Sequence, residues 1–544
     1  MARTPLLTEV QRLAADFDRQ VSRREFIKVT GAAVGAAAVT SPIAAIAGGL
    51  RSNSDPAPRI AIVGGGIAGL NAALTLQDAG ITSTVYEASN RVGGRMHSDS
   101  PLTNPNGSST WENDQTSEHC GELIDSGHKT ILKLANRFNL ATVDLLAAEP
   151  IHSSDTYYFG GQYYPRSQAI TDFKPVYNAV HKDVTAAGYP TTYKMHTAAG
   201  VALDQMSVYD WIESRVPGGH SSRMGQLLDV AYNIEYGNVT TVQSSLNLVY
   251  LLAFQPVPGN FRIFGASDER YHIAGGNERL PKAIAASLPQ SSIKLNTALT
   301  TIAINADGSY KLSFSSPTGP FTMTFDRVIL ALPFSVLRTL NYRKANFDSL
   351  KVTAIAELAY GANAKLQLQF DTRYWNDPAG PWVASVGIST GATYADTRYQ
   401  NTWDVTRGQG GETGILVDYT GGGVPLASFK GQPTTADAVS YGQTFLEELE
   451  PVFPGISAHW NRRATLDTPL TNPFLLGSYS YWKVGQYVKF SGYEGARQPF
   501  PNGKCHFAGE HCSTDFQGFM EGGASEGARA AGEILTDYKL GIFP

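Results

Sequence analysis

Three glycines in G-x-G-x-x-G spacing, Gly64, Gly66 and Gly69, are suited to hold phosphate groups. The first glycine allows a tight turn, the second lets the backbone approach a pyrophosphate, and the third lets a helix pack closely on a sheet. A helix beginning here would direct its free N–H groups and its positive dipole end at the phosphates. Glu87 follows roughly 20 residues later, where a carboxylate binds ribose hydroxyls. These residues predict a dinucleotide site.

The segments around the glycines have the patterns that such a site requires. Arg59 to Val63 is typical of a short buried strand, Leu70 to Ala79 of a helix, and Thr82 to Tyr86 of a second strand. A lone glycine motif is weak evidence, but a strand before it and a helix after it are the context that it needs. The chain is therefore predicted to begin an α/β, Rossmann-like domain.

Two further segments indicate which dinucleotide is bound. The run Glu87-Ala-Ser-Asn-Arg-Val-Gly-Gly-Arg-Met-His-Ser98 resembles the E-A-x-x-R-x-G-G-R-x-x-S segment of the FAD-binding amine oxidase superfamily. Cys505 to Ala531 resembles that family's F-A-G-E … G-x-M-E-G-A closing motif. The resemblance extends from about residue 59 to 535 and implies FAD as the cofactor. The FAD contacts that it implies are Gly64, Gly66, Gly69, Glu87, Ala88, Arg95, Gly121, Glu122, Ile302, Glu510, Gly518, Phe519 and Met520.

The resemblance also implies the residues on the substrate side of the flavin. Lys365 matches the family lysine that holds a water against flavin N5, and it is the candidate catalytic residue. Tyr479 and Phe519 would form the walls of an aromatic cage, with Trp482 as a further substrate contact. Ser478 stands where monoamine oxidases carry their flavin-linking cysteine, so the FAD is expected to be non-covalent. Pattern alone equally allows a solvated lysine and aromatic residues of a core.

Glu122 marks a departure from one branch of the family. Animal L-amino acid oxidases have an arginine in this segment that grips the substrate carboxylate, whereas this chain has Gly121-Glu-Leu-Ile124. Glu122 could favour a cationic substrate, or it could be a structural carboxylate beside the cofactor. The sequence leaves both roles open.

The activity implied by the resemblance is oxidative deamination by hydride transfer to flavin N5. The products would be an imine, then a carbonyl compound and ammonia, with hydrogen peroxide formed from oxygen. The substrate could be an L-amino acid, including a basic one, or a monoamine or polyamine. A quinone-linked amine dehydrogenase and a non-catalytic, flavin-bound scaffold are the alternatives. The sequence does not decide the oligomeric state, with a homodimer as one option.

Composition excludes other classes of partner. Hydrophobic residues make up 42% and charged residues 17%, as in an ordinary globular protein. The net charge of −5 implies no nucleic acid or other polyanion. Cys120, Cys505 and Cys512 have no metal-ligand spacing, so free thiols and no metal site are expected.

The N-terminus has the pattern of an export signal. Ser22-Arg-Arg-Glu-Phe-Ile-Lys28 matches the twin-arginine signature, and an uncharged Ala/Gly-rich run follows to Leu50. The prediction is a signal segment over 1–47 that is read by the twin-arginine export machinery, with a periplasmic or extracellular protein as the result. The run is also long enough to be a membrane anchor.

The order of the motifs predicts a cofactor domain that is interrupted by a substrate domain. The FAD-binding parts are expected at 59–150, 271–335 and 476–544, and the inserted α+β substrate domain at 151–270 and 336–475. Ile293 to Ile304 is expected to form one strand, and the glycine-rich stretch Gly408 to Gly423 a surface loop.

Overall fold

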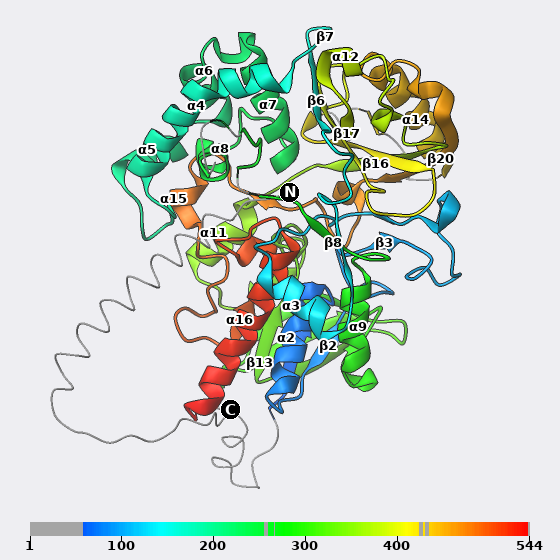
Figure 1. The fold of residues 1–544 in the computed structure, drawn as a ribbon. Coiled ribbons are helices and arrows are strands. Elements are labelled where there is room, and N and C mark those ends of the chain that lie inside the picture. The colour runs from blue at the N-terminus through cyan, green and yellow to red at the C-terminus, as the bar shows by residue number, and fades with distance from the viewer. Residues whose placement is uncertain are drawn as a thin grey trace, which may run out of the picture.

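The computed structural model describes residues 58–254, 259, 261–265, 267–423, 428–429 and 435–541. The predicted twin-arginine segment lies outside these residues. Within them, every helix is too short or too polar to cross a membrane. The chain forms two lobes, which we call the Rossmann lobe and the mixed lobe (Figure 1).

A five-stranded parallel sheet is the centre of the Rossmann lobe. Its strands, in order across the sheet, are β22 (Cys505–Phe507), β13 (Arg327–Leu330), β1 (Ile60–Val63), β2 (Thr84–Tyr86) and β9 (Ile293–Lys294). The sheet thus joins strands from the beginning, middle and end of the chain. Helices α2 (Ile67–Asp78) and α16 (Met520–Lys539) pack side by side against it (Figure 1). The predicted Rossmann-like fold is confirmed.

The single strand predicted over Ile293 to Ile304 is wrong. Residues of this stretch form β9 in the parallel sheet and β10 (Ala298–Ile304) in a separate four-stranded sheet. The chain turns between them at Asn296, which has a left-handed backbone with φ of 51°. The other strands of this second sheet are β11 (Tyr310–Ser315), β12 (Phe321–Phe325) and β14 (Asn341–Lys344). Because β14 pairs with β10, the sheet continues past the boundary predicted at residue 335.

A seven-stranded sheet is the centre of the mixed lobe. Its strands, in order, are β20 (Trp460–Asp467), β16 (Ala364–Phe370), β19 (Gly414–Thr420), β18 (Asn401–Asp404), β17 (Ser389–Ala395), β6 (Ser154–Phe159) and β7 (Gln162–Tyr163). The surface loop predicted over Gly408 to Gly423 is therefore wrong in part. Every residue of β19 is buried, because this strand pairs with β16 on one side and β18 on the other.

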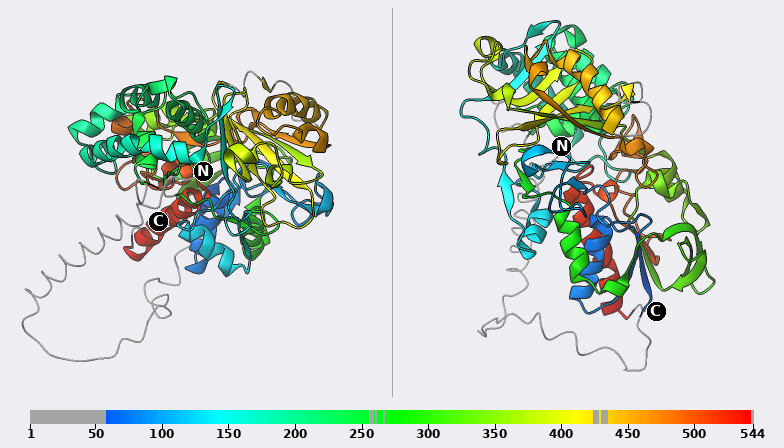
Figure 2. Two further views of the ribbon diagram at one scale, coloured as in Figure 1. Left: turned by 45° about the horizontal axis from the view of Figure 1, so that its top comes forward. Right: turned by 90° about the vertical axis from the view of Figure 1, so that its right-hand side faces the viewer.

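A helical bundle lies beside this sheet (Figures 1 and 2). Its helices are α4 (Arg166–Ala187), α5 (Ala198–Asp204), α6 (Val208–Arg215), α7 (Arg223–Tyr236) and α8 (Ser245–Leu252). Ser207, Ser222 and Ser244 cap three of them by accepting a backbone N–H.

The remaining helices and short strands connect the two lobes or cover their faces. They are β3 (Ser98–Asp99), β4 (Ser117–Glu118), α3 (Lys129–Arg137), β5 (Thr142–Asp144), β8 (Tyr271–Ile273), α9 (Arg279–Ser287), α10 (Phe334–Leu337), α11 (Ser349–Glu357), β15 (Ala359–Tyr360), α12 (Val383–Val386), α14 (Thr435–Leu449), β21 (Ser480–Tyr481) and α15 (Gln486–Phe490). Cys120, Cys505 and Cys512 are free thiols, as expected.

Candidate functional site

A cavity of about 570 Å³ is lined by residues of both lobes. This volume is within the range of roughly 300–1,000 Å³ that is usual for ligand pockets. The Rossmann lobe contributes the glycine-rich turn, the segment Glu87 to Met96, the segment His119 to Leu123 and the start of α16. The mixed lobe contributes Lys365, Trp403 and Tyr419.

The three motif glycines meet different surroundings in this turn. A side chain at Gly64 would collide with the Ala331 carbonyl, and one at Gly69 with the Gly64 carbonyl. These two positions are therefore restricted to glycine by the packing of the turn itself. At Gly66 the nearest atom to an added Cβ would be the Gly93 carbonyl oxygen, 4.0 Å away. Gly66 thus borders open cavity space, where a phosphate could approach the backbone.

Two helices begin at this cavity without a side-chain cap. Gly66 precedes α2 and Phe519 precedes α16, and neither provides a side-chain hydrogen bond to the first turn. The N–H groups at both helix starts can therefore donate to phosphate or ring oxygens. Together with the open space at Gly66, this arrangement fits FAD, whose pyrophosphate and flavin oxygens would accept hydrogen bonds from these N–H groups. Gly121, Gly518 and Met520 line the cavity near the start of α16.

The Glu87 carboxylate is held at the cavity wall. One of its oxygens accepts the Gly65 N–H at 2.6 Å, and the other accepts the Ser89 N–H at 2.8 Å. Ala88 lines the cavity beside it. Ile302, predicted as a contact near the adenine, is fully buried and does not line the cavity. Leu299, nearer the start of β10, lines it instead, whereas Ile302 packs in the hydrophobic core.

A buried ion pair joins the two ends of the family resemblance. Arg95 Nη1 donates to Glu510 Oε1 at 2.8 Å and to the Ser478 carbonyl at 2.9 Å. Glu510 Oε2 accepts from Ser480 Oγ at 2.7 Å and from the Gly518 N–H at 2.8 Å. Burial alone would raise the pKa of Glu510, but the charge of Arg95 lowers it below its usual value. The carboxylate therefore remains charged and links Arg95, Ser480 and Gly518 at the cavity wall.

Lys365 lies on the face of β16 that is directed at the cavity. In the sheet it is directly opposite Tyr419 of β19 and Asp467 of β20. Its Nζ donates to Glu122 Oε2 at 2.7 Å and to the Glu118 carbonyl at 3.2 Å. The structure thus brings Lys365 and Glu122, two predicted site residues, into contact.

The cavity wall includes four aromatic residues that could contact a substrate: Trp403, Tyr419, Tyr479 and Phe519. The Tyr419 and Tyr479 hydroxyls are 3.0 Å apart, and the Trp403 and Tyr419 rings are 5.1 Å apart. Sequence analysis predicted Tyr479 and Phe519 but missed the other two. Tyr419 was missed because its strand, β19, was predicted to be a surface loop. The apolar run Ile415 to Val417 could have indicated the strand.

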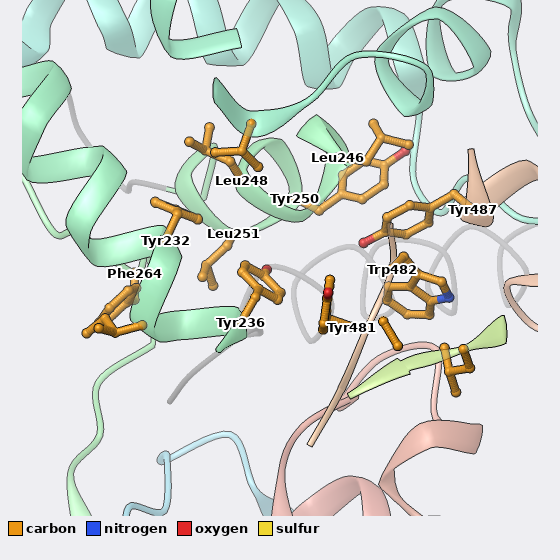
Figure 3. Packing of buried hydrophobic residues seen from close by; sticks show 14 of the residues in the cluster. Tyr232, Tyr236, Leu246, Leu248, Tyr250, Leu251, Phe264, Tyr481, Trp482 and Tyr487 are labelled. Carbon is orange, nitrogen blue, oxygen red and sulfur yellow. The ribbon is translucent and has the colours of Figure 1, made fainter. Parts of the chain in front are cut away.

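Trp482, predicted as a substrate contact, does not line this cavity. Its ring is 4.4 Å from the Tyr487 ring (Figure 3). Its Nε1 donates to Glu494 Oε1 at 3.1 Å. The side chain belongs to the buried cluster shown there, which includes Tyr250 and Tyr481. The predicted substrate contact is therefore wrong, and the core interpretation holds for Trp482.

Ser478 and His511 also line the cavity. Ser478 Oγ donates to Asn363 Oδ1 at 2.6 Å, so its hydroxyl is engaged by the protein. His511 lines the cavity, and burial lowers its pKa to about 3, which leaves the imidazole neutral. Sequence analysis did not single out His511, since a histidine after Glu510 has no distinguishing spacing.

The positive charges of the wall are already engaged by the protein. Among the described residues that line the cavity, the arginines and lysine are Arg91, Arg95 and Lys365. Arg91 donates to the Val92 and Gly94 carbonyls, while Arg95 and Lys365 pair with Glu510 and Glu122. This part of the structure therefore offers a substrate carboxylate no arginine or lysine without a protein partner.

Comparison with known proteins adds the following similarities. A family model described as flavin containing amine oxidoreductase matches residues 67–535. A putative L-amino-acid oxidase, YobN, of Bacillus subtilis (strain 168) is 23% identical, over 90% of this chain and 97% of that protein. Polyamine oxidase 6 of Oryza sativa subsp. japonica is 25% identical, over 88% of this chain and 91% of that protein.

Solved structures show the same fold. Cyclohexylamine oxidase from Brevibacterium oxydans IH-35A matches with a TM-score of 0.73 at 20% identity, over 89% of this chain and 100% of that chain. Putrescine oxidase with bound putrescine matches with a TM-score of 0.71 at 17% identity, over 88% of this chain and 99% of that chain.

Proposed function

Because this chain belongs to the flavin-containing amine oxidoreductase family and is an FAD-dependent enzyme, we propose that it oxidises an amine whose reacting carbon carries no carboxylate. The bound FAD would accept a hydride from the C–H bond beside the amine. The resulting imine would hydrolyse to a carbonyl compound and ammonia, and oxygen would be reduced to hydrogen peroxide.

Residues of the cavity wall would enclose the substrate and supply a hydrogen-bond donor. Tyr419, Tyr479, Trp403 and Phe519 would enclose the apolar part of the amine and exclude water. Lys365 has three N–H donors, and Glu122 and the Glu118 carbonyl accept from it. A third donor is left for a water in the cavity.

The pairing of Lys365 with Glu122 is the observation that carries this proposal. A substrate α-carboxylate beside the aromatic wall would lose its hydration without gaining a cationic partner there. An uncompensated buried charge costs several kcal/mol. An L-amino acid is the second candidate substrate, and the similarity to YobN and to the L-amino-acid oxidase of Mus musculus favours it.

A substrate panel with two electron acceptors tests the proposed reaction. We expect the FAD-loaded protein to form hydrogen peroxide with at least one monoamine, diamine or polyamine, and the panel should include basic and neutral L-amino acids. Reduction of a quinone dye without peroxide would identify a dehydrogenase instead. A flavin that none of these compounds bleaches would identify a non-catalytic scaffold.

We also propose that the protein is exported through the twin-arginine route to the periplasm or the extracellular space. The support is the sequence Ser22 to Lys28, which lies outside the described residues. Replacing the pair by Arg23→Lys and Arg24→Lys should retain the precursor in the cytoplasm, since the receptor reads both arginines. Fractionation followed by immunoblotting measures this, and normal export of the double variant would refute the proposal.

A further inference from the structure

Each oxygen of the Glu122 carboxylate accepts a hydrogen bond from the protein at the cavity wall. Its Oε2 accepts from Lys365 Nζ at 2.7 Å, and its Oε1 accepts from Trp403 Nε1 at 2.9 Å. The side chains of Glu122 and Lys365 are each 6% exposed. We infer that Glu122 is a positioning residue, which fixes the Lys365 ammonium at the cavity wall, and that it does not receive the substrate's positive charge.

The contact between Glu122 and Lys365 joins the Rossmann lobe to the mixed lobe, so it can fix where Lys365 lies at the cavity wall. Glu122 follows β4 in the Rossmann lobe, and its backbone carbonyl accepts from Asn277 Nδ2 at 2.7 Å. Lys365 and Trp403 lie on β16 and β18 of the mixed lobe. Lys365 already neutralises the Glu122 charge, so a substrate ammonium bound here would be a second cation beside a single carboxylate. The carboxylate is therefore placed to orient Lys365 between the lobes.

The ionisable groups around the pair leave Glu122 as the main counter-charge. Burial raises the pKa of Glu118 to about 8 and that of Cys120 to about 11, so both are mostly neutral at pH 7. Burial lowers the pKa of His272 and raises that of Tyr419, which keeps these two groups neutral as well. Asp467, opposite Lys365 in the sheet, is 3.0 Å from His119 Nδ1.

Glu122 itself remains ionised despite its burial. Burial alone would raise the pKa of its carboxyl group, but the charge and hydrogen bond of Lys365 and the bond from Trp403 lower the pKa below its usual value. Removing this charge would leave the Lys365 amine buried without a counter-ion. Of the two contacts that hold its Nζ, only the one to the Glu118 carbonyl would remain unchanged.

The first test uses Glu122→Gln in the FAD-loaded protein, with the flavin reduced by light so that no amine is required. The inference rests on the proposed function only in taking oxygen as the acceptor. We expect reoxidation by oxygen at pH 7 to be at least about tenfold slower in the variant than in the parent. Glu122→Asp, which keeps the carboxylate on a shorter side chain, should recover part of that rate.

Thermal unfolding of the same proteins at pH 7 provides a second readout that does not depend on turnover. Glu122→Gln should lower the Tm, because it leaves the buried Lys365 ammonium without a counter-ion. Adding Lys365→Met removes that cation and should recover part of the loss.

Glu494→Gln is the matched control. The Glu494 carboxylate also accepts from a tryptophan, Trp482, and is buried, but it does not line the cavity. Its variant should keep the parent's rate of reoxidation. If Glu122→Gln does not retain FAD, Trp403→Phe serves as the second variant, because it removes one donor to the carboxylate and keeps an aromatic ring. It should slow reoxidation by a smaller factor.

Two outcomes would overturn the inference. One is a Glu122→Gln variant with the parent's reoxidation rate and the parent's Tm. The other is a raised KM for the amine with the reoxidation rate unchanged, which would make Glu122 the substrate's ammonium site. If no amine reduces the parent flavin but the light-reduced variant reoxidises slowly and Glu122→Asp recovers the rate, the proposed function fails and the role of Glu122 stands.

Discussion

Gly66→Val is expected to yield a folded protein that no longer binds FAD. An added Cβ at Gly66 meets no protein atom nearer than the Gly93 carbonyl oxygen at 4.0 Å, so the fold can accommodate the side chain. The valine would project into the cavity space where the pyrophosphate approaches the backbone. Visible flavin absorbance measures the loss, and far-UV circular dichroism checks the fold.

Gly532→Val is the control for the glycine replacement itself. Gly532 lies within α16, and an added Cβ there meets no atom within 4 Å. This variant should therefore retain FAD. Retention of a full flavin complement by Gly66→Val would contradict the assignment of the pyrophosphate to this turn. A Gly66→Val protein that is unfolded would contradict the geometry at Gly66.

Lys365→Met should slow reoxidation of the flavin by at least about tenfold, equivalent to a loss of roughly 1.4 kcal/mol. The ammonium is the positive charge of β16 that reaches the cavity, where it would stabilise the negative charge that develops on oxygen. Methionine keeps most of the side-chain volume and removes the charge. The variant should still bind FAD and be reduced by an amine without oxygen, as stopped-flow absorbance can measure.

Because Lys365 pairs with Glu122, this experiment requires a control for the effect of the unpaired carboxylate. Lys365→Met leaves the buried Glu122 carboxylate without its cation, which is costly unless the carboxyl group takes up a proton. The double replacement Lys365→Met with Glu122→Gln removes both charges and should show the same slow reoxidation. Unchanged reoxidation in both variants would make Lys365 a structural residue. Loss of FAD in both would mean that the pair supports cofactor binding instead.

Local patterns predicted much of the Rossmann lobe. The glycine turn with its flanking strand and helix, and the helix beginning at Met520, could be read from short segments, since each has its own periodicity or glycine spacing. The strand β19 could not, because glycines on both sides of Ile415 to Tyr419 masked a buried run. The turn at Asn296 likewise separated two strands that composition presented as one.

The candidate site was predictable only one residue at a time. Lys365 and Glu122 were each recognised by resemblance, but they are 243 residues apart in sequence and no local pattern reports their contact. That contact changes the interpretation of both residues, because the Glu122 carboxylate accepts hydrogen bonds from Lys365 and from Trp403. Trp482 shows the converse case: its segment resembles a cofactor-facing one, yet its ring lies in the core.

The central claim is that this cavity accepts an amine and rejects its α-carboxylate counterpart. The most direct measurement is anaerobic stopped-flow bleaching of the flavin by matched pairs: cadaverine with L-lysine, phenethylamine with L-phenylalanine, and tyramine with L-tyrosine. For the pair that contains the preferred side chain, we expect the amine to reduce the flavin with a second-order rate constant at least about 100-fold above that of the amino acid, as an uncompensated buried carboxylate implies. Reduction by the L-amino acid at an equal or higher rate than by its amine would contradict the claim.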